Sequence, residues 1–142
     1  MKRVTLTAAV VLVAALALAP AAMAKGAKVR LDKSEYGRVL MNGGGKALYL
    51  FTSDTRNQSN CEGDCAQAWP PFLTKGKPQA GNGLKGKLLG TIRRADGSRQ
   101  VTYRGHPLYF YVDDRPGLIL CQDVVEFGGT WLLVNRKGNA VR

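Results

Sequence analysis

The chain has 142 residues, with 21 Lys and Arg against ten Asp and Glu, and its formal net charge is +11. This length supports one domain with one hydrophobic core and excludes two robust ones. The basic excess favours anionic neighbours such as acidic lipid surfaces or cell-wall polymers. The basic residues are spread along the chain, and we expect no specific nucleic-acid partner.

The first 24 residues are typical of a signal peptide. Lys2 and Arg3 precede an apolar run over 8–22, which closes on Ala22-Met23-Ala24, a small-x-small cleavage site. We expect cleavage after Ala24; an uncleaved N-terminal anchor is the alternative. The run is short for a membrane span and no later segment is long or apolar enough, so the mature chain should not be transmembrane. No cysteine stands at the cleavage site, so there is no lipobox, and we expect a periplasmic or extracellular protein.

Residues 25–142 should form a single β domain. Two of the 21 basic residues and none of the acidic ones lie in the first 24, so this part carries a net charge of +9. In its first half, strands are expected at 28–31, 36–41 and 47–51. Asn42-Gly43-Gly44-Gly45 supplies residues that adopt positive φ, so the second and third of these strands should form a hairpin.

The rest of the first half is less regular. A polar loop is expected from 55 to 66 and a single helical turn at 66–69, which Pro70-Pro71 stops. Residues 71–73 should be extended. The Gly- and Lys-rich stretch 74–87 is interpreted as a long exposed connection to the second half.

The second half has clearer strand signals. Asp96-Gly97 between the runs 88–94 and 99–103 is a strong hairpin signal. A third strand is expected at 108–112, and after a loop and a bend at Gly128-Gly129 a last one at 130–134. No stretch of ten residues has helical periodicity. We therefore predict an all-β fold with a minor helical turn: a small sandwich or partly closed barrel of two related hairpin units with pseudo-two-fold symmetry.

A repeated motif supports this duplication. Leu48 to Asp54 and Leu108 to Asp114 both read Leu-Tyr-x-aromatic-x-x-Asp, and a cysteine follows each Asp after seven residues. The repeats extend over about 36–73 and 88–134. Side chains alternate across a strand, so the motif aromatics of each copy should share one face.

The motif has two interpretations. In the first, the two strands form the core seam, and the tyrosine hydroxyls bond to the aspartates or to the backbone. In the second, the aromatic faces form a ligand platform with the aspartates as polar anchors. The residues concerned in both are Tyr49, Phe51, Asp54, Tyr109, Tyr111 and Asp114.

Three cysteines in an exported chain predict one disulfide and one remaining thiol. Cys61 and Cys65 are four residues apart, and a helical turn would bring their Cα atoms within disulfide range. A bond from Cys121 to either of them is the alternative.

The sequence contains no recognisable catalytic constellation. There is no Gly-x-Ser-x-Gly and only one histidine, His106, to act as a base. No spacing matches a zinc, EF-hand or iron–sulfur site, and no cofactor is expected. A copper or haem site using His106 and Cys121 is the alternative, because imidazole and soft ligands suit copper.

Five sequence motifs, with the repeated motif counted once, carry a family resemblance. Besides the two copies of the repeated motif they are Cys61-Glu-Gly-Asp-Cys65-Ala-Gln-Ala-Trp69-Pro-Pro, Leu89-Gly-Thr-Ile-Arg-Arg-Ala-Asp-Gly97, Gln100-Val-Thr-Tyr-Arg-Gly-His-Pro-Leu-Tyr109 and Phe127-Gly-Gly-Thr-Trp131. This combination resembles the bacterial secreted repeat of unknown function proteins, often described as predicted lipoproteins with a Tyr-x-aromatic-x-x-Asp motif. The resemblance implies export, duplication and a cysteine pair at Cys61 and Cys65, and it implies no activity. The chain departs from the family in lacking a lipobox and in placing Cys121 in a loop that is usually Gly-rich.

We therefore expect an exported, non-catalytic β domain that binds an envelope protein or an anionic surface polymer or lipid. The alternative is a periplasmic metal or redox accessory protein that uses His106 and Cys121. A functional surface should lie where the halves differ: the cysteine loop, the basic stretch 75–87, and the turn at His106.

Overall fold

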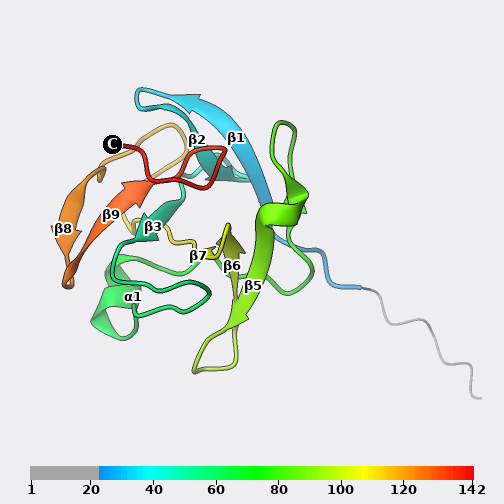
Figure 1. Cartoon of the computed structure of the whole chain (residues 1–142), viewed down its shortest axis with the longest axis horizontal. Helices are drawn as coiled ribbons and strands as arrows, with labels where there is room; N and C mark the ends of the chain where they lie inside the picture. The colour runs from blue at the N-terminus through cyan, green and yellow to red at the C-terminus, as the bar shows by residue number, and fades with distance from the viewer. Residues whose placement is uncertain (1–22) are drawn as a thin grey trace, which may run out of the picture.

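The computed structural model describes residues 23–142, so nearly all of the expected signal peptide lies outside the described residues. One short helix, α1 (Asp64–Ala68), and one 3-10 turn, η1 (Gly86–Leu88), interrupt a chain of short strands (Figure 1). The strands are β1 (Lys28–Ser34), β2 (Gly37–Asn42), β3 (Tyr49–Phe51), β4 (Gln79–Ala80), β5 (Leu89–Arg93), β6 (Arg99–Tyr103), β7 (His106–Pro107), β8 (Val124–Glu126) and β9 (Gly129–Leu133).

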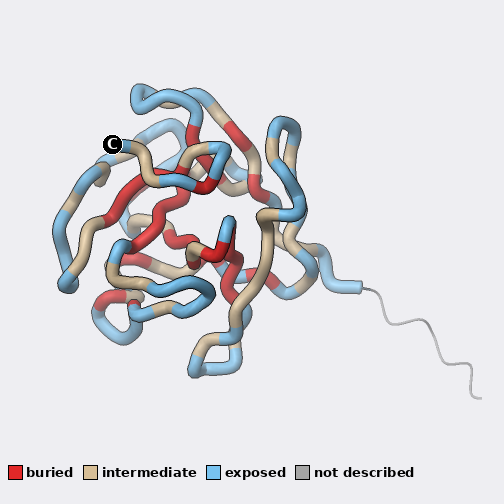
Figure 2. Tube along the Cα trace, in the orientation of Figure 1, coloured by how far each residue is buried: buried red, intermediate tan, exposed pale blue. Residues whose placement is uncertain are grey.

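These strands form three small sheets, ordered β2-β1-β4, β3-β9-β8 and β5-β6-β7. Within residues 23–142 no sheet closes into a barrel. Only the contact between β1 and β4 is parallel; the other strand pairs are antiparallel. Buried residues follow the strands through the middle of the molecule, and exposed residues occupy the turns around them (Figure 2). The all-β prediction with two related units is confirmed.

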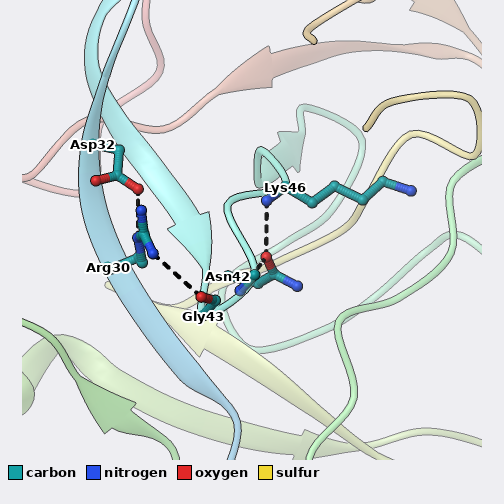
Figure 3. A network of polar contacts seen from close by, with 6 residues as sticks. Arg30, Asp32, Asn42, Gly43 and Lys46 are labelled. Carbon is teal, nitrogen blue, oxygen red and sulfur yellow. Dashed lines mark hydrogen bonds and ion pairs between the residues drawn. The ribbon is translucent and has the colours of Figure 1, made fainter. Parts of the chain in front are cut away.

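The first hairpin is formed by β1 and β2, and the turn after β2 is closed by the side chain of Asn42. The Asn42 side-chain oxygen accepts the amides of Gly44 at 3.1 Å and Lys46 at 2.9 Å, and Met41 then bridges to Ala47. Figure 3 shows this turn beside Arg30, whose guanidinium bonds both Asp32 and the carbonyl of Gly43. The asparagine thus supplies the acceptor that a tight turn needs, and Gly45 adopts the left-handed conformation of the turn, at φ 86°.

Three local expectations were wrong. Residues 108–112 do not form a continuous strand, because their amides bond in turn to Val101, Tyr49, Pro70 and Ala68, which lie in different segments. The loop expected before Gly128-Gly129 contains β8, which forms a hairpin with β9. The hairpin expected from 36–41 and 47–51 is reduced to the single bridge between Met41 and Ala47, because β2 and β3 lie in different sheets. The connection 74–87 is largely exposed, as expected, and it contains the short strand β4, which pairs with β1.

The two halves exchange strand partners. In the first half, Tyr49 of β3 pairs with Leu133, two residues after Trp131. In the second half, Tyr109 bridges to Pro71, two residues after Trp69. Each motif segment therefore lies against the residues that follow the tryptophan of the other half. Tyr49 and Tyr109 also exchange backbone hydrogen bonds of 2.9 and 3.0 Å, so the pseudo-two-fold axis passes between them.

The motif segments divide the interior into two hydrophobic clusters. Leu48, Leu50 and Leu108 lie in one cluster, and Tyr49 and Tyr109 lie in the other. This division follows from the alternation of side chains along an extended chain. Both faces of the motif are buried, so the segments are central to the fold.

The second cluster is built on stacked rings. Trp69 and Trp131 stack with their centroids 4.1 Å apart. Phe51 stacks on Trp131, with the ring centroids 4.1 Å apart. Tyr111 contacts Trp69 at a tilt, with the ring centroids 4.9 Å apart. Phe51 and Tyr111 occupy the same position in the two motifs. Each of them therefore packs on the tryptophan of the other repeat. Such ring contacts add stabilisation beyond the area that they bury.

Truncation of the stack should destabilise the whole domain. We expect Trp131→Ala to lower the free energy of unfolding by about 3–5 kcal/mol, because it empties the space between Phe51 and Trp69. Urea denaturation measures this loss. Tyr36→Ala is the control, since Tyr36 is 39% exposed and should change stability by about 0.5 kcal/mol or less. Equal losses for the two variants would contradict the central role of the stack.

Candidate functional site

The repeated motif forms a reciprocal pair of hydrogen bonds between the halves. Tyr49 Oη donates to Asp114 Oδ2 at 2.5 Å, and Tyr109 Oη donates to Asp54 Oδ2 at 2.8 Å. Each tyrosine therefore bonds the aspartate of the other repeat. We call these four residues the tyrosine–aspartate seam.

The second oxygen of each aspartate fixes a loop. Asp54 Oδ1 accepts the amide of Asn60 at 2.7 Å, and Asp114 Oδ1 accepts the amide of Leu120 at 2.9 Å. Both amides lie six residues after the carboxylate, immediately before a cysteine. The same side chain thus joins the halves through one oxygen and closes its own loop through the other, which is a common task for an aspartate in a turn.

Burial sets the protonation behaviour of the seam. It raises the pKa of Asp54 to about 6 and also raises the pKa of Asp114. Burial raises the pKa of both tyrosines, so the hydroxyls remain neutral donors at physiological pH. Every buried side-chain nitrogen or oxygen in residues 23–142 has a hydrogen-bond partner. The polar groups of the seam therefore serve as hydrogen-bond partners for one another.

The candidate ligand-platform residues lie mostly inside the protein. Tyr49 and Tyr109 are fully buried and Phe51 is 2% exposed, while Tyr111 is only partly buried. Their faces contact one another and the two tryptophans.

The cysteines are arranged as expected. Cys61 and Cys65 form a disulfide across the start of α1, with their Cα atoms 5.3 Å apart. Cys121 is a free, partly buried thiol. Burial raises its pKa, and the Tyr111 hydroxyl lies within hydrogen-bonding reach.

His106 and Cys121, the two residues of the alternative metal site, have different surroundings. His106 is on β7, half-buried, and its pKa is lowered by burial and by the guanidinium groups of Arg104 and Arg56. In the described part of the chain, no three His, Cys, Asp or Glu residues are grouped so that they could hold a metal ion.

The structure also assembles a feature that the sequence did not predict as a unit. Three segments meet around a depression of about 240 Å³, which we call the basic cleft. Its lining residues are Lys85, Lys87, Leu88, Arg104, Arg136 and Lys137. Five of the six are cationic and none is acidic. The sequence signals were the basic stretch 75–87 and the turn at His106, but nothing in the pattern linked either to the C-terminal pair Arg136-Lys137.

The seam should be energetically coupled across the halves. We expect Tyr49→Phe to lower the free energy of unfolding by about 1–3 kcal/mol, because it leaves a buried acceptor of Asp114 without its donor. A double-mutant cycle with Asp114→Asn, measured by urea denaturation, should give a coupling of about 0.5–3 kcal/mol. Tyr36→Phe, at an exposed hydroxyl, is the control. If the losses of unfolding free energy in the two single variants add up to the loss in the double variant, the result would count against the bond between the repeats.

The buried carboxyl of Asp54 should make stability depend on pH. Its pKa in the folded protein is about 6, above its ordinary value of 3.8. The folded state therefore holds this proton more tightly than the unfolded state does, and the resulting stabilisation is complete below about pH 4 and is lost as the pH rises through 6. The contribution is at most about 3 kcal/mol, lost between pH 4 and 6. The pKa of His106 is lowered and acts in the opposite direction. The measurement is therefore the difference between wild type and Asp54→Asn from pH 4 to 8; a difference that does not change with pH would refute the shift.

The family comparison agrees with the duplicated structure. Two segments, residues 31–72 and 90–135, match the family described as "secreted repeat of unknown function", and together they cover more than half of the chain. No curated protein and no solved structure gives a significant match. Among the described residues, none of the helices has the length and apolar character needed to cross a bilayer. The chain belongs to the family of secreted repeats of unknown function.

Proposed function

We propose that this exported protein is a non-catalytic β domain that binds an anionic envelope surface, polymer or lipid, through the basic cleft. The observation that carries this proposal is that five cationic residues from three separate segments line one depression. Gathering like charges is unfavourable unless an anion occupies the space between them. The description of the family as secreted supports export.

The interior supports a binding role over a catalytic one. The tyrosines and aspartates of the seam bond one another, which leaves them without a free base or nucleophile. The single histidine lies beside Arg104, whose charge disfavours the imidazolium form. General acid–base catalysis needs a group that exchanges protons with a substrate, and these groups are committed to the fold or electrostatically restrained.

The binding should be electrostatic and therefore sensitive to salt. Exposed charges are screened over about 8 Å at physiological ionic strength. The net charge of +9 on residues 25–142 would speed encounter with an anionic surface. The cleft would then provide the closest contact, because five of its six lining residues are cationic and none is acidic.

Co-sedimentation with vesicles tests the proposal. We expect the protein to bind vesicles that contain phosphatidylglycerol and not vesicles of phosphatidylcholine alone, and to dissociate as salt is raised. Lys87→Glu with Arg136→Glu should weaken binding by at least about tenfold, because each basic residue near an anionic membrane contributes about 1 kcal/mol. Heparin retention is the parallel measurement for an anionic polymer.

Lys33→Glu with Arg38→Glu is the matched control. Both residues are exposed, they face each other across the β1–β2 hairpin, and the change in net charge is the same. Equal weakening by the two double variants would show that overall charge, and not the cleft, governs binding. Binding that does not change with salt would also contradict the proposal and would favour a protein partner.

A further inference from the structure

We infer that the basic cleft recognises a phosphate group with at least two negative charges, a phosphomonoester or a diphosphate, at the end of a lipid or polymer. This inference rests on the proposed function and specifies the chemistry of its site. Three features of the cleft favour such a group: its cationic side chains are held in place, some of their donors remain available, and the space is small.

Arg104 is the best-positioned cation of the cleft. Its backbone is in the left-handed region, at φ 51°, and its amide bonds the carbonyl of Leu88 at 2.8 Å. Its Nη1 donates to the carbonyl of Lys137 and to the side chain of Asn139. Both side-chain bonds use Nη1, so the Nε and Nη2 edge remains for a ligand. That edge is the fork that binds an oxyanion with two parallel hydrogen bonds.

The turn that carries Arg136 and Lys137 is locked. Asn135 Oδ1 accepts the amides of Lys137 at 2.9 Å and Asn139 at 3.1 Å. Tyr103 Oη donates to the carbonyl of Arg136 at 2.8 Å. The two cationic side chains therefore project from a fixed backbone, so less conformational entropy is lost when they bind an anion.

Gly138 brings this turn against Arg104. It has a φ of 81°, and a Cβ at this position would lie 2.6 Å from Cβ of Arg104. A side chain at position 138 would therefore separate two of the three segments that form the cleft. On the third segment, the amide of Leu88 bonds the carbonyl of Lys85 at 2.9 Å and fixes the turn that carries Lys85 and Lys87.

The ligand chemistry follows from charge and size. A carboxylate has one charge and two oxygens, so it can occupy one arginine fork but cannot satisfy four further cations. A phosphomonoester or diphosphate has more charge and more acceptor oxygens, and lysines bind phosphate as point charges around such a fork. The volume of about 240 Å³ is smaller than that of pockets that enclose drug-sized ligands. The cleft thus fits a headgroup on a larger molecule.

Backbone amide NMR with small anions tests this inference. At constant ionic strength, we expect inorganic pyrophosphate to shift the amides of Arg104 and Lys137 and to bind at least about tenfold more tightly than the singly charged anions acetate and dimethyl phosphate. Lys87→Glu with Arg136→Glu should abolish these shifts, and Lys33→Glu with Arg38→Glu should preserve them. Gly138→Ala should weaken binding without removing any charge. The dispersed amide spectrum of each variant verifies its fold.

The possible outcomes separate the phosphate inference from the proposed function. Equal binding of dimethyl phosphate and pyrophosphate, or equal shifts at the Lys33–Arg38 hairpin, would overturn the inference of a doubly charged phosphate even if anionic vesicles still bind, and the proposed function would survive. If the wild-type protein binds neither pyrophosphate nor anionic vesicles, the phosphate inference and the proposed function would both be overturned. Preference for phosphatidic acid vesicles over phosphatidylglycerol vesicles of equal charge would support a lipid phosphate, and preference for soluble polyphosphate over either would support a polymer.

Discussion

The fold depends on the exchange of hydrogen bonds between the two repeats. Tyr49 needs the carboxylate of Asp114, and Tyr109 needs that of Asp54. Since a buried polar group without a partner costs free energy, neither half can satisfy its own motif in the absence of the other. The strand exchange around the pseudo-two-fold axis has the same consequence. Two repeats therefore make one cooperative domain.

This constraint separates the structural residues from the proposed binding residues. The seam and the stacked rings use positions that correspond between the repeats. The basic cleft uses the connection between the repeats, one turn of the second repeat and the C-terminal turn. These parts do not take part in the reciprocal bonds, so their charge can change without loss of a seam partner. The interior, which is similar in the two repeats, positions the three segments of the basic cleft. The surface, which differs between the repeats, carries the cationic side chains of the cleft.

Local chemistry in the sequence was enough for much of the fold. Alternation around Tyr49 and Tyr109 predicted that the leucines and the motif aromatics take opposite faces, and Asn42 and the following glycines predicted the turn after β2. The close spacing of Cys61 and Cys65 favoured their disulfide. Each of these inferences concerns residues a few positions apart, where backbone geometry limits the choices.

Only the tertiary structure decided which segments meet. Periodicity predicted an extended conformation for 108–112 but could not assign its amides to partners in several other segments. It also could not show that each tyrosine bonds the aspartate of the other repeat, because both pairings satisfy the same pattern. The basic cleft has the same origin: Lys87, Arg104 and Arg136 are separated in the chain, and only long-range packing brings them together. The sequence by itself thus determined the class of the fold and its duplication, whereas long-range hydrogen bonds and packing decided the strand exchange and the cleft.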